Sequence, residues 1–221
     1  MLGSGFPVLR PKRTALILAA VMLALIALHV VAMQANFNAA LGLKQAWGFE
    51  YWQIAIFDLD EEESFGTWFS TMILLYASIL ALYAAGLVRA GGGRLHRWWM
   101  ALGLALGAMS VDEVVGLHEL LNSIDEDSQW TVAAFFLVVA AGLCFLPFLW
   151  HYRWRTSGLL FAAGLVFLSG ALGLEHFSGN QVNSLEYNML TGVEEGLEMA
   201  GVILLVYALL DFIHRQAGRD N

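Results

Sequence analysis

The chain has 221 residues, of which 59% are hydrophobic and 14% are charged, and its formal net charge at pH 7 is −8. A soluble domain has about a quarter of its residues charged, so this composition excludes an ordinary water-soluble globular protein and favours a membrane protein. The acidic balance gives no support to nucleic-acid binding, and the single cysteine excludes an internal disulfide.

Six apolar stretches are each long enough for a helix that crosses a bilayer, which needs about 20 residues. The first follows a basic segment but is too long for the apolar core of a secretory signal peptide, so we interpret it as a retained span. Residues 34–64 are rich in aromatic side chains and predict a segment along the outer interface. We therefore predict an all-α, six-transmembrane-helix bundle in a single domain over residues 1–221. Its predicted spans are about 14–33, 66–88, 98–121, 131–150, 156–176 and 190–213.

The basic residues predict the orientation of this bundle. Lysine and arginine collect in the cytoplasmic loops of membrane proteins. With the N-terminus inside, all of the eleven basic residues except Lys44 fall on the cytoplasmic side. We therefore predict that both termini are cytoplasmic. Acidic residues sort to the outer connections, and we expect the run at residues 58–63 to be a solvated face or a weak cation-binding segment.

Small residues in the third and fifth predicted spans indicate close helix packing. Spacing of the small-xxx-small kind, as at Gly103 and Gly107, lets two helix backbones approach each other. The fifth span has Gly164, Gly170 and Gly173 in similar positions. This pattern predicts packing and carries no functional meaning of its own.

Several carboxylates lie inside the predicted spans, although a charge at the bilayer centre costs about 2.5–3.5 kcal/mol. The third and fifth spans run outward and the sixth runs inward, so these acids share one layer near the outer face. Another acid, Asp211, lies at the inner end beside Arg215, where we expect it to be solvated. His29 also falls in the outer half of its span. The acids of the outer layer are Asp112, Glu113, Glu119, Glu175, Glu194, Glu195 and Glu198.

Helical spacing groups these acids further. Asp112 and Glu119 are seven residues apart and would share one face of a continuous helix. Glu198 shares a face with Glu194 and with Glu195, which precede it by four and three residues. No lysine or arginine lies in the outer halves of these spans to neutralise them. The acids therefore bind metal, hold protons in a relay or cation path, or reach the solvated interface.

We predict a site for one or two divalent metal ions near the periplasmic face. Helical bundles build such centres from carboxylates and imidazoles on facing helices, and these ligands suit iron, manganese or zinc. Glu113, Glu175 and Glu194 are candidates for bridging or proton transfer, and no catalytic residue is assigned. The predicted ligands are Asp112, His118, Glu119, Glu175, His176, Glu195 and Glu198.

Three motifs stand out after residue 50. They are DLDxE at 58–62 followed by TWFS at 67–70, SxDE at 110–113 followed by HE at 118–119, and EExxEM at 194–199. With these motifs the chain resembles a family of multi-span bacterial membrane proteins that has no assigned activity. The resemblance implies a location in the bacterial inner membrane and implies no reaction.

Three classes of function follow from the sequence. The first is a metal-dependent hydrolase or di-iron oxidoreductase that acts on a lipid-like substrate. The second is a proton- or cation-coupled transporter, which requires polar residues through the full depth of the bundle, whereas the inner halves of the spans are apolar. The third is a non-catalytic subunit of a respiratory or photosynthetic complex. The expected partners are the lipid bilayer and either another membrane protein or a second copy of the chain, and no nucleic acid.

Overall fold

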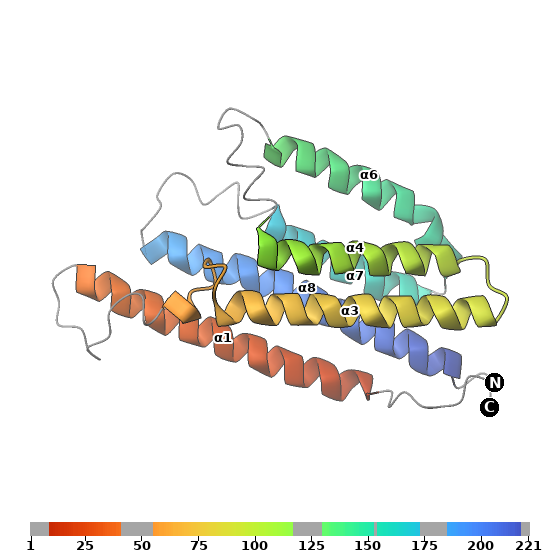
Figure 1. Ribbon diagram of the computed structural model, residues 1–221, viewed down its shortest axis with the longest axis horizontal. Coiled ribbons are helices and arrows are strands. Elements are labelled where there is room, and N and C mark those ends of the chain that lie inside the picture. Colours follow the sequence, from red (N-terminus) through yellow and green to blue (C-terminus); the bar gives the residue numbers. More distant parts are fainter. Residues whose placement is uncertain (1–8, 41–54, 117–129, 153, 173–184, 218–221) are drawn as a thin grey trace.

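The structure is a computed structural model that describes residues 9–40, 55–116, 130–152, 154–172 and 185–217. Within these residues the protein is all-helical (Figure 1), as the sequence predicted, and it has no strand. Its elements are α1 (Pro11–Ala40), the 3-10 turn η1 (Ala55–Phe57), α3 (Phe65–Ala90), α4 (His96–Val115), α6 (Trp130–His151), α7 (Trp154–Ala171) and α8 (Leu185–Ala217).

Four of the helices are long and apolar enough to cross a membrane. They are α1 over Pro11–Ala35, α3, α4, and α8 over Leu185–Gln216. The described stretch Val139–His151 of α6 is also apolar but is shorter, and α7 has 18 residues. The protein is therefore a helical membrane protein, and the fourth and fifth predicted spans stay a prediction.

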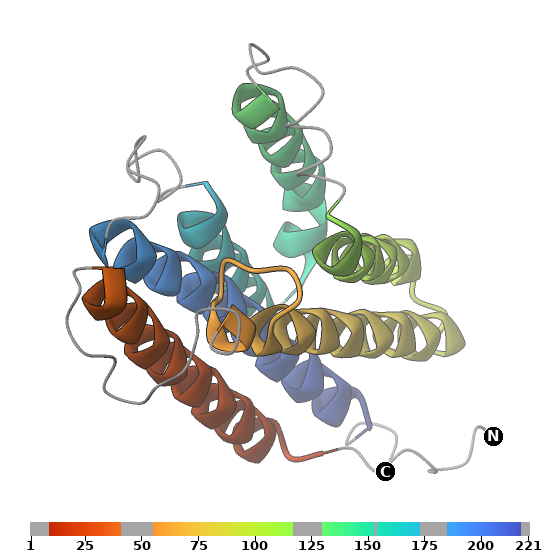
Figure 2. The same cartoon turned by 60° about the vertical axis from the view of Figure 1, so that its left-hand side comes forward.

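The helices pack as two antiparallel hairpins with α8 at the centre. α3 packs along α4, α7 packs along α8, and α8 also contacts α1 and α3. Five of the largest fully buried side chains belong to α8, which fits its central place. α6 contacts α7, and its N-terminal end stands away from the other helices (Figure 2).

Glycine allows the closest helix contacts. A Cβ atom on Gly103 of α4 would lie 2.7 Å from Cγ of Leu82 on α3. Ser78 of α3 donates a hydrogen bond of 2.7 Å to the Gly103 carbonyl. A Cβ atom on Gly201 of α8 would lie 2.6 Å from the backbone nitrogen of Phe167 on α7. The small residues of α4 therefore pack as their spacing predicted, whereas a Cβ atom on Gly164 of α7 would meet nothing within 4 Å.

α4 ends earlier than the third predicted span. Gly116 follows it with a left-handed backbone (φ 61°), a conformation that favours glycine, and its N–H bonds to the Asp112 carbonyl at 2.8 Å. The predicted span continues to residue 121. The shared face that we predicted for Asp112 and Glu119 depends on that continuous helix, and α4 has stopped before Glu119, which lies outside the described residues.

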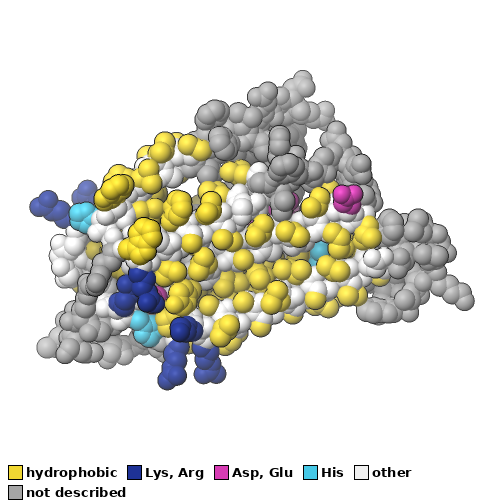
Figure 3. Space-filling model, turned by 180° about the vertical axis from the view of Figure 1, so that it is seen from behind, with side chains coloured by type: hydrophobic (Ala, Val, Ile, Leu, Met, Phe, Trp, Pro, Cys, Tyr) yellow, Lys and Arg dark blue, Asp and Glu magenta, His cyan; other side chains and the backbone are white. Residues whose placement is uncertain are grey.

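The described basic and acidic side chains sort to opposite ends of the bundle. Lysine and arginine lie where α1, α4 and α7 begin and where α3 and α8 end, which we call the basic end. Residues 58–63, the end of α4 and the first turns of α8 form the opposite, acidic end. Figure 3 shows the dark blue basic side chains gathered at one end of an otherwise hydrophobic surface. This separation agrees with the predicted sorting of charge.

Asp211 is the described carboxylate that belongs to the basic end. Arg155 of α7 binds its two oxygens at 2.8 and 3.1 Å, and Arg215 binds at 2.7 Å. The Asp211 side chain is only 13% exposed. Our expectation of a solvated carboxylate was therefore wrong, because two guanidinium groups replace most of its water and join α7 to α8.

Candidate functional site

A cluster of carboxylates lies at the acidic end around Glu195 of α8. The carboxylates of Glu198, Glu113, Glu194 and Asp60 lie within Coulombic range of Glu195 and repel a negative charge on it. These residues come from α8, from α4 and from the segment before α3. All except the exposed Asp60 are half-buried. We call these five residues the carboxylate cluster.

Close packing between neighbouring elements positions the residues of the carboxylate cluster. A Cβ atom on Gly170 of α7 would lie 2.7 Å from the Glu194 carbonyl and 3.0 Å from Cγ of Glu198. The carboxylate of Glu62 fills the space beside Cα of Gly116, so residues 58–63, which we call the acidic segment, lie against the end of α4. Repelling charges gathered in this way favour the binding of a cation or the sharing of protons. The eight basic residues that the structure describes all lie at the basic end and do not neutralise the cluster.

A buried histidine lies next to this cluster. His29 of α1 has no exposed surface, and its Nδ1 accepts a hydrogen bond of 3.1 Å from the backbone N–H of Leu59. Since Nδ1 is the acceptor, Nε2 carries the proton and donates to the carbonyl of Asn188 at 2.7 Å. The ring thus joins α1 to the acidic segment and to the first turn of α8.

Asp58 is the acidic neighbour of this histidine. Its Oδ1 lies 3.4 Å from Nδ1 of His29 and also accepts a hydrogen bond of 3.1 Å from the Asp60 N–H. Asp58 is 5% exposed and Leu59 is 4% exposed. Our expectation of a solvated face at residues 58–63 was therefore wrong for Asp58, although Asp60 and residues 61–63 are exposed.

Sequence reasoning missed the hydrogen bonds of His29 with Leu59 and Asn188. A histidine in an apolar span needs hydrogen-bond partners for both ring nitrogens, and this need was the one available signal. The partners could not be assigned from the sequence because they lie 30 and 159 residues away along the chain. Gly192 gives the ring its space, since a Cβ atom there would lie 3.0 Å from Cδ2 of His29.

The structure tests only part of the predicted metal site. Glu195 and Glu198 meet in the carboxylate cluster, and the half-buried Asp112 lies one residue before Glu113 at the end of α4. Among the described residues, no group of three or more histidine, cysteine, aspartate or glutamate side chains is placed to hold a metal ion. The remaining predicted ligands lie outside the described residues; they are His118, Glu119, Glu175 and His176.

The fold and the site define a helical membrane protein with a carboxylate-rich end. The family described as a domain of unknown function (DUF8692) matches residues 15–212, so the chain belongs to this family. This agrees with the resemblance to a family without an assigned activity. No curated protein and no solved structure matches the chain.

Proposed function

We propose that the chain is a six-span protein of the bacterial inner membrane that binds one or two divalent metal ions near the periplasmic face. The observation that supports this proposal is the gathering of Glu113, Glu194, Glu195 and Glu198 with Asp60, from three parts of the chain. A divalent cation offsets the mutual repulsion of such carboxylates, and iron, manganese and zinc all accept oxygen and imidazole ligands. His118, Glu119, Glu175 and His176 are the proposed additional ligands.

Two reaction classes suit such a metal centre. A bound metal ion lowers the pKa of a coordinated water and makes it a nucleophile for hydrolysis. Carboxylate-bridged iron pairs in helical bundles carry out oxidations. Because the proposed centre lies at one end of a bundle of apolar helices, we propose a lipid-like substrate for either reaction.

Transport of protons or cations is the second candidate, and the basic end disfavours it. Aromatic rings fill the bundle there, with Trp99 packed against Phe148 at a centroid distance of 5.0 Å and against Phe212 at 4.5 Å. Trp99 is fully buried. A cation path needs polar groups along its length, whereas this group of rings is apolar apart from the hydrogen bond from Trp99 to the Tyr152 hydroxyl at 2.7 Å.

Metal analysis of the purified full-length protein tests the proposal. We expect iron, manganese or zinc in a stoichiometric amount after gentle purification, measured by mass spectrometry of the elements. The double variant Glu195→Gln and Glu198→Gln keeps side-chain size and removes two charges, so the metal content should fall strongly.

The matched control is Glu186→Gln, which alters an exposed carboxylate in the first turn of the same helix. Its metal content should equal that of the wild type. A wild-type protein that holds no metal, and takes up none when iron, manganese or zinc is added, would refute the metal centre.

A further inference from the structure

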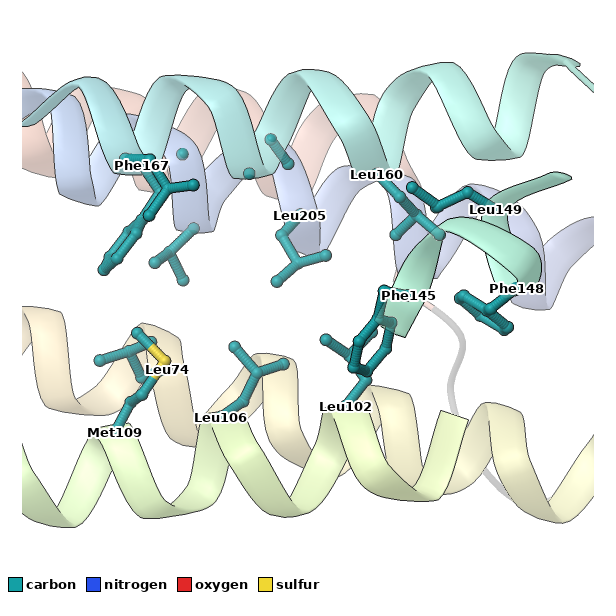
Figure 4. A pocket seen from close by; sticks show the side chains of 15 residues that line it. Leu74, Leu102, Leu106, Met109, Phe145, Phe148, Leu149, Leu160, Phe167 and Leu205 are labelled. Carbon is teal, nitrogen blue, oxygen red and sulfur yellow. The ribbon is translucent and has the colours of Figure 1, made fainter. Parts of the chain in front are cut away.

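An apolar cavity of about 320 Å³ lies between α4 and α7 (Figure 4), with α3 and α8 also contributing to its wall. Its lining consists of leucine, phenylalanine, methionine, valine, alanine and glycine residues and includes no polar side chain. Small-molecule sites in proteins have volumes of about 300–1,000 Å³, so this cavity is large enough for a ligand. Only an apolar ligand suits such a wall, because a polar group inside it would find no hydrogen-bond partner.

Aromatic side chains close the cavity toward the basic end. Phe145 and Phe148 of α6 line this part of the wall (Figure 4). Behind them, Trp98 packs against Phe145 at a centroid distance of 5.3 Å, and Trp99 packs against Phe148 at 5.0 Å. The innermost part of a ligand in the cavity therefore contacts these aromatic rings. We call Phe145 and Phe148 the floor of the cavity.

The opposite end of the cavity leads to the carboxylate cluster along α4. Leu102, Leu106 and Met109 line the cavity, and Glu113 follows Met109 by four residues. Residues separated by four, three and four positions lie on one face of a helix. The helix face that walls the cavity therefore continues into a carboxylate.

The same register occurs on α8, which runs in the opposite direction. Gly201 and Leu205 line the cavity, and Glu198 and Glu194 precede Gly201 by three and seven residues. On α7, the lining residue Phe167 lies one turn from Gly170, beside which Cγ of Glu198 lies. Three walls of the cavity thus lead to the same group of acids.

A buried hydroxyl also lies toward this end of the cavity. Thr71 precedes the lining residue Leu74 by one turn of α3, and its Oγ1 has no hydrogen-bond partner within the described part of the chain. The Thr71 carbonyl accepts a hydrogen bond of 3.0 Å from Ser110 of α4, which places Thr71 at the contact of these two walls. Buried hydroxyls rarely lack a partner, and Thr71 lies one turn beyond the lining residue Leu74, on the side of the carboxylate cluster.

We infer that this cavity binds the hydrocarbon chain of a lipid-derived amphiphile whose polar head lies at the carboxylate cluster. The inference rests on the proposed function for the role of the cluster, and it specifies the substrate as a long-chain molecule with a hydroxyl-type head. An uncharged hydroxylic head suits the cluster because it adds no negative charge and can donate to a carboxylate. The hydrocarbon chain of the ligand can enter the cavity from the bilayer beside Gly164. This glycine lines the cavity and is exposed, as is its neighbour Leu165.

Photolabelling of the full-length protein in lipid nanodiscs tests the inference. The probe is a long-chain primary alcohol with a diazirine at the chain end, and peptide mass spectrometry maps the labelled residues. We expect labels on Phe145 and Phe148 at the floor of the cavity. Exposed Phe161 and Leu165 on α7 serve as the standard for labelling from the bilayer.

Two variants should remove the labels from the floor and leave those of the standard unchanged. Gly164→Phe introduces a ring at a lining position where a Cβ atom meets nothing within 4 Å, and Leu205→Trp enlarges a second lining residue. The matched control is Gly158→Phe, which changes an equally open glycine of α7 that does not line the cavity. In this control, the labelling of Phe145 and Phe148 should equal that in the wild type.

Labels on the floor that persist in both cavity variants would overturn the inference. An alkane probe of the same length that labels the floor as well as the alcohol would show ordinary filling by bilayer lipid, which would also overturn it. All labelling is done with a chelator present, so failure of the metal proposal leaves these results unchanged. Conversely, a labelling result that overturns the lipid-binding inference has no bearing on the metal content, which is measured separately.

Discussion

His29 shows how a single side chain can hold the acidic end together. Both ring nitrogens are used, one by the Leu59 N–H and the other by the Asn188 carbonyl. The two backbone groups belong to different parts of the chain, and the Leu59 N–H lies outside any helix. The ring therefore acts as a bridge among α1, the acidic segment and α8, and it supports the carboxylate cluster without belonging to it.

Replacing His29 by alanine should destabilise the protein. A buried polar group left without a partner costs about 1–3 kcal/mol, and the variant leaves the Leu59 N–H in this state, so we expect the free energy of unfolding to fall by about 1–3 kcal/mol. Unfolding titrations in detergent micelles, followed by circular dichroism, measure this change.

The control for this variant is His214→Ala. His214 is exposed and makes one hydrogen bond of 3.2 Å to the Leu9 carbonyl. Surface changes of this kind stay within about 0.5 kcal/mol. Equal losses for the two histidine variants would contradict the bridging role of His29.

At the residue scale, the sequence predicts the kind of side chain at the site better than its partners. Glu195 and Glu198 could be predicted as neighbours because helical spacing is local information. The contacts of His29 with Asp58 and of Asp211 with Arg155 could not, because they join residues distant along the chain. Acidic residues at an interface look alike in sequence whether they are solvated or paired.

At the scale of elements, glycine sets the distance between α3 and α4. Gly103→Ala should destabilise the protein, because its Cβ would lie 2.7 Å from Cγ and 3.1 Å from the backbone nitrogen of Leu82. Overpacking of this kind costs about 1–3 kcal/mol. The same unfolding titration measures the loss.

Gly86→Ala on α3 is the matched control for this packing contact. A Cβ atom on Gly86 meets nothing within 4 Å, and alanine favours a helix over glycine by about 1 kcal/mol. We therefore expect no loss of stability. A Gly103 variant as stable as the Gly86 variant would show that α3 and α4 do not approach as closely as described.

The helices could be predicted from the apolar runs of the sequence. The residues at which they end, and the helices they contact, could be assigned only from the tertiary structure. Hydropathy detects a long apolar segment and not the left-handed glycine that stops α4 at Val115. Gly164 and Gly103 have similar sequence surroundings, yet one borders a cavity and the other packs against a neighbouring helix. Spacing indicates which residues share a face and leaves open what that face meets.

At the scale of the whole molecule, charge and packing follow the same axis. From the basic end to the acidic end, the bundle has arginine side chains, then aromatic rings, then the apolar cavity and finally the carboxylate cluster. Charge sorting could be predicted from the sequence, because it depends only on the order of spans. The cavity could not, because it is the space left between side chains of several helices.

The orientation of this axis leads to a prediction about the whole protein in the cell. The positive-inside rule places the basic end in the cytoplasm and the acidic end outside. A cysteine introduced at the exposed Glu62 should therefore react with a membrane-impermeant maleimide on intact cells of a bacterial expression host whose outer membrane is permeable to the reagent. A cysteine at the exposed Ala90, at the end of α3, should react only after the inner membrane is broken.

Both variants are made with Cys144→Ser, which removes the chain's one native cysteine. The reverse labelling pattern would place the carboxylate cluster on the cytoplasmic side, where the proposed lipid-like substrate would have to come from the inner leaflet.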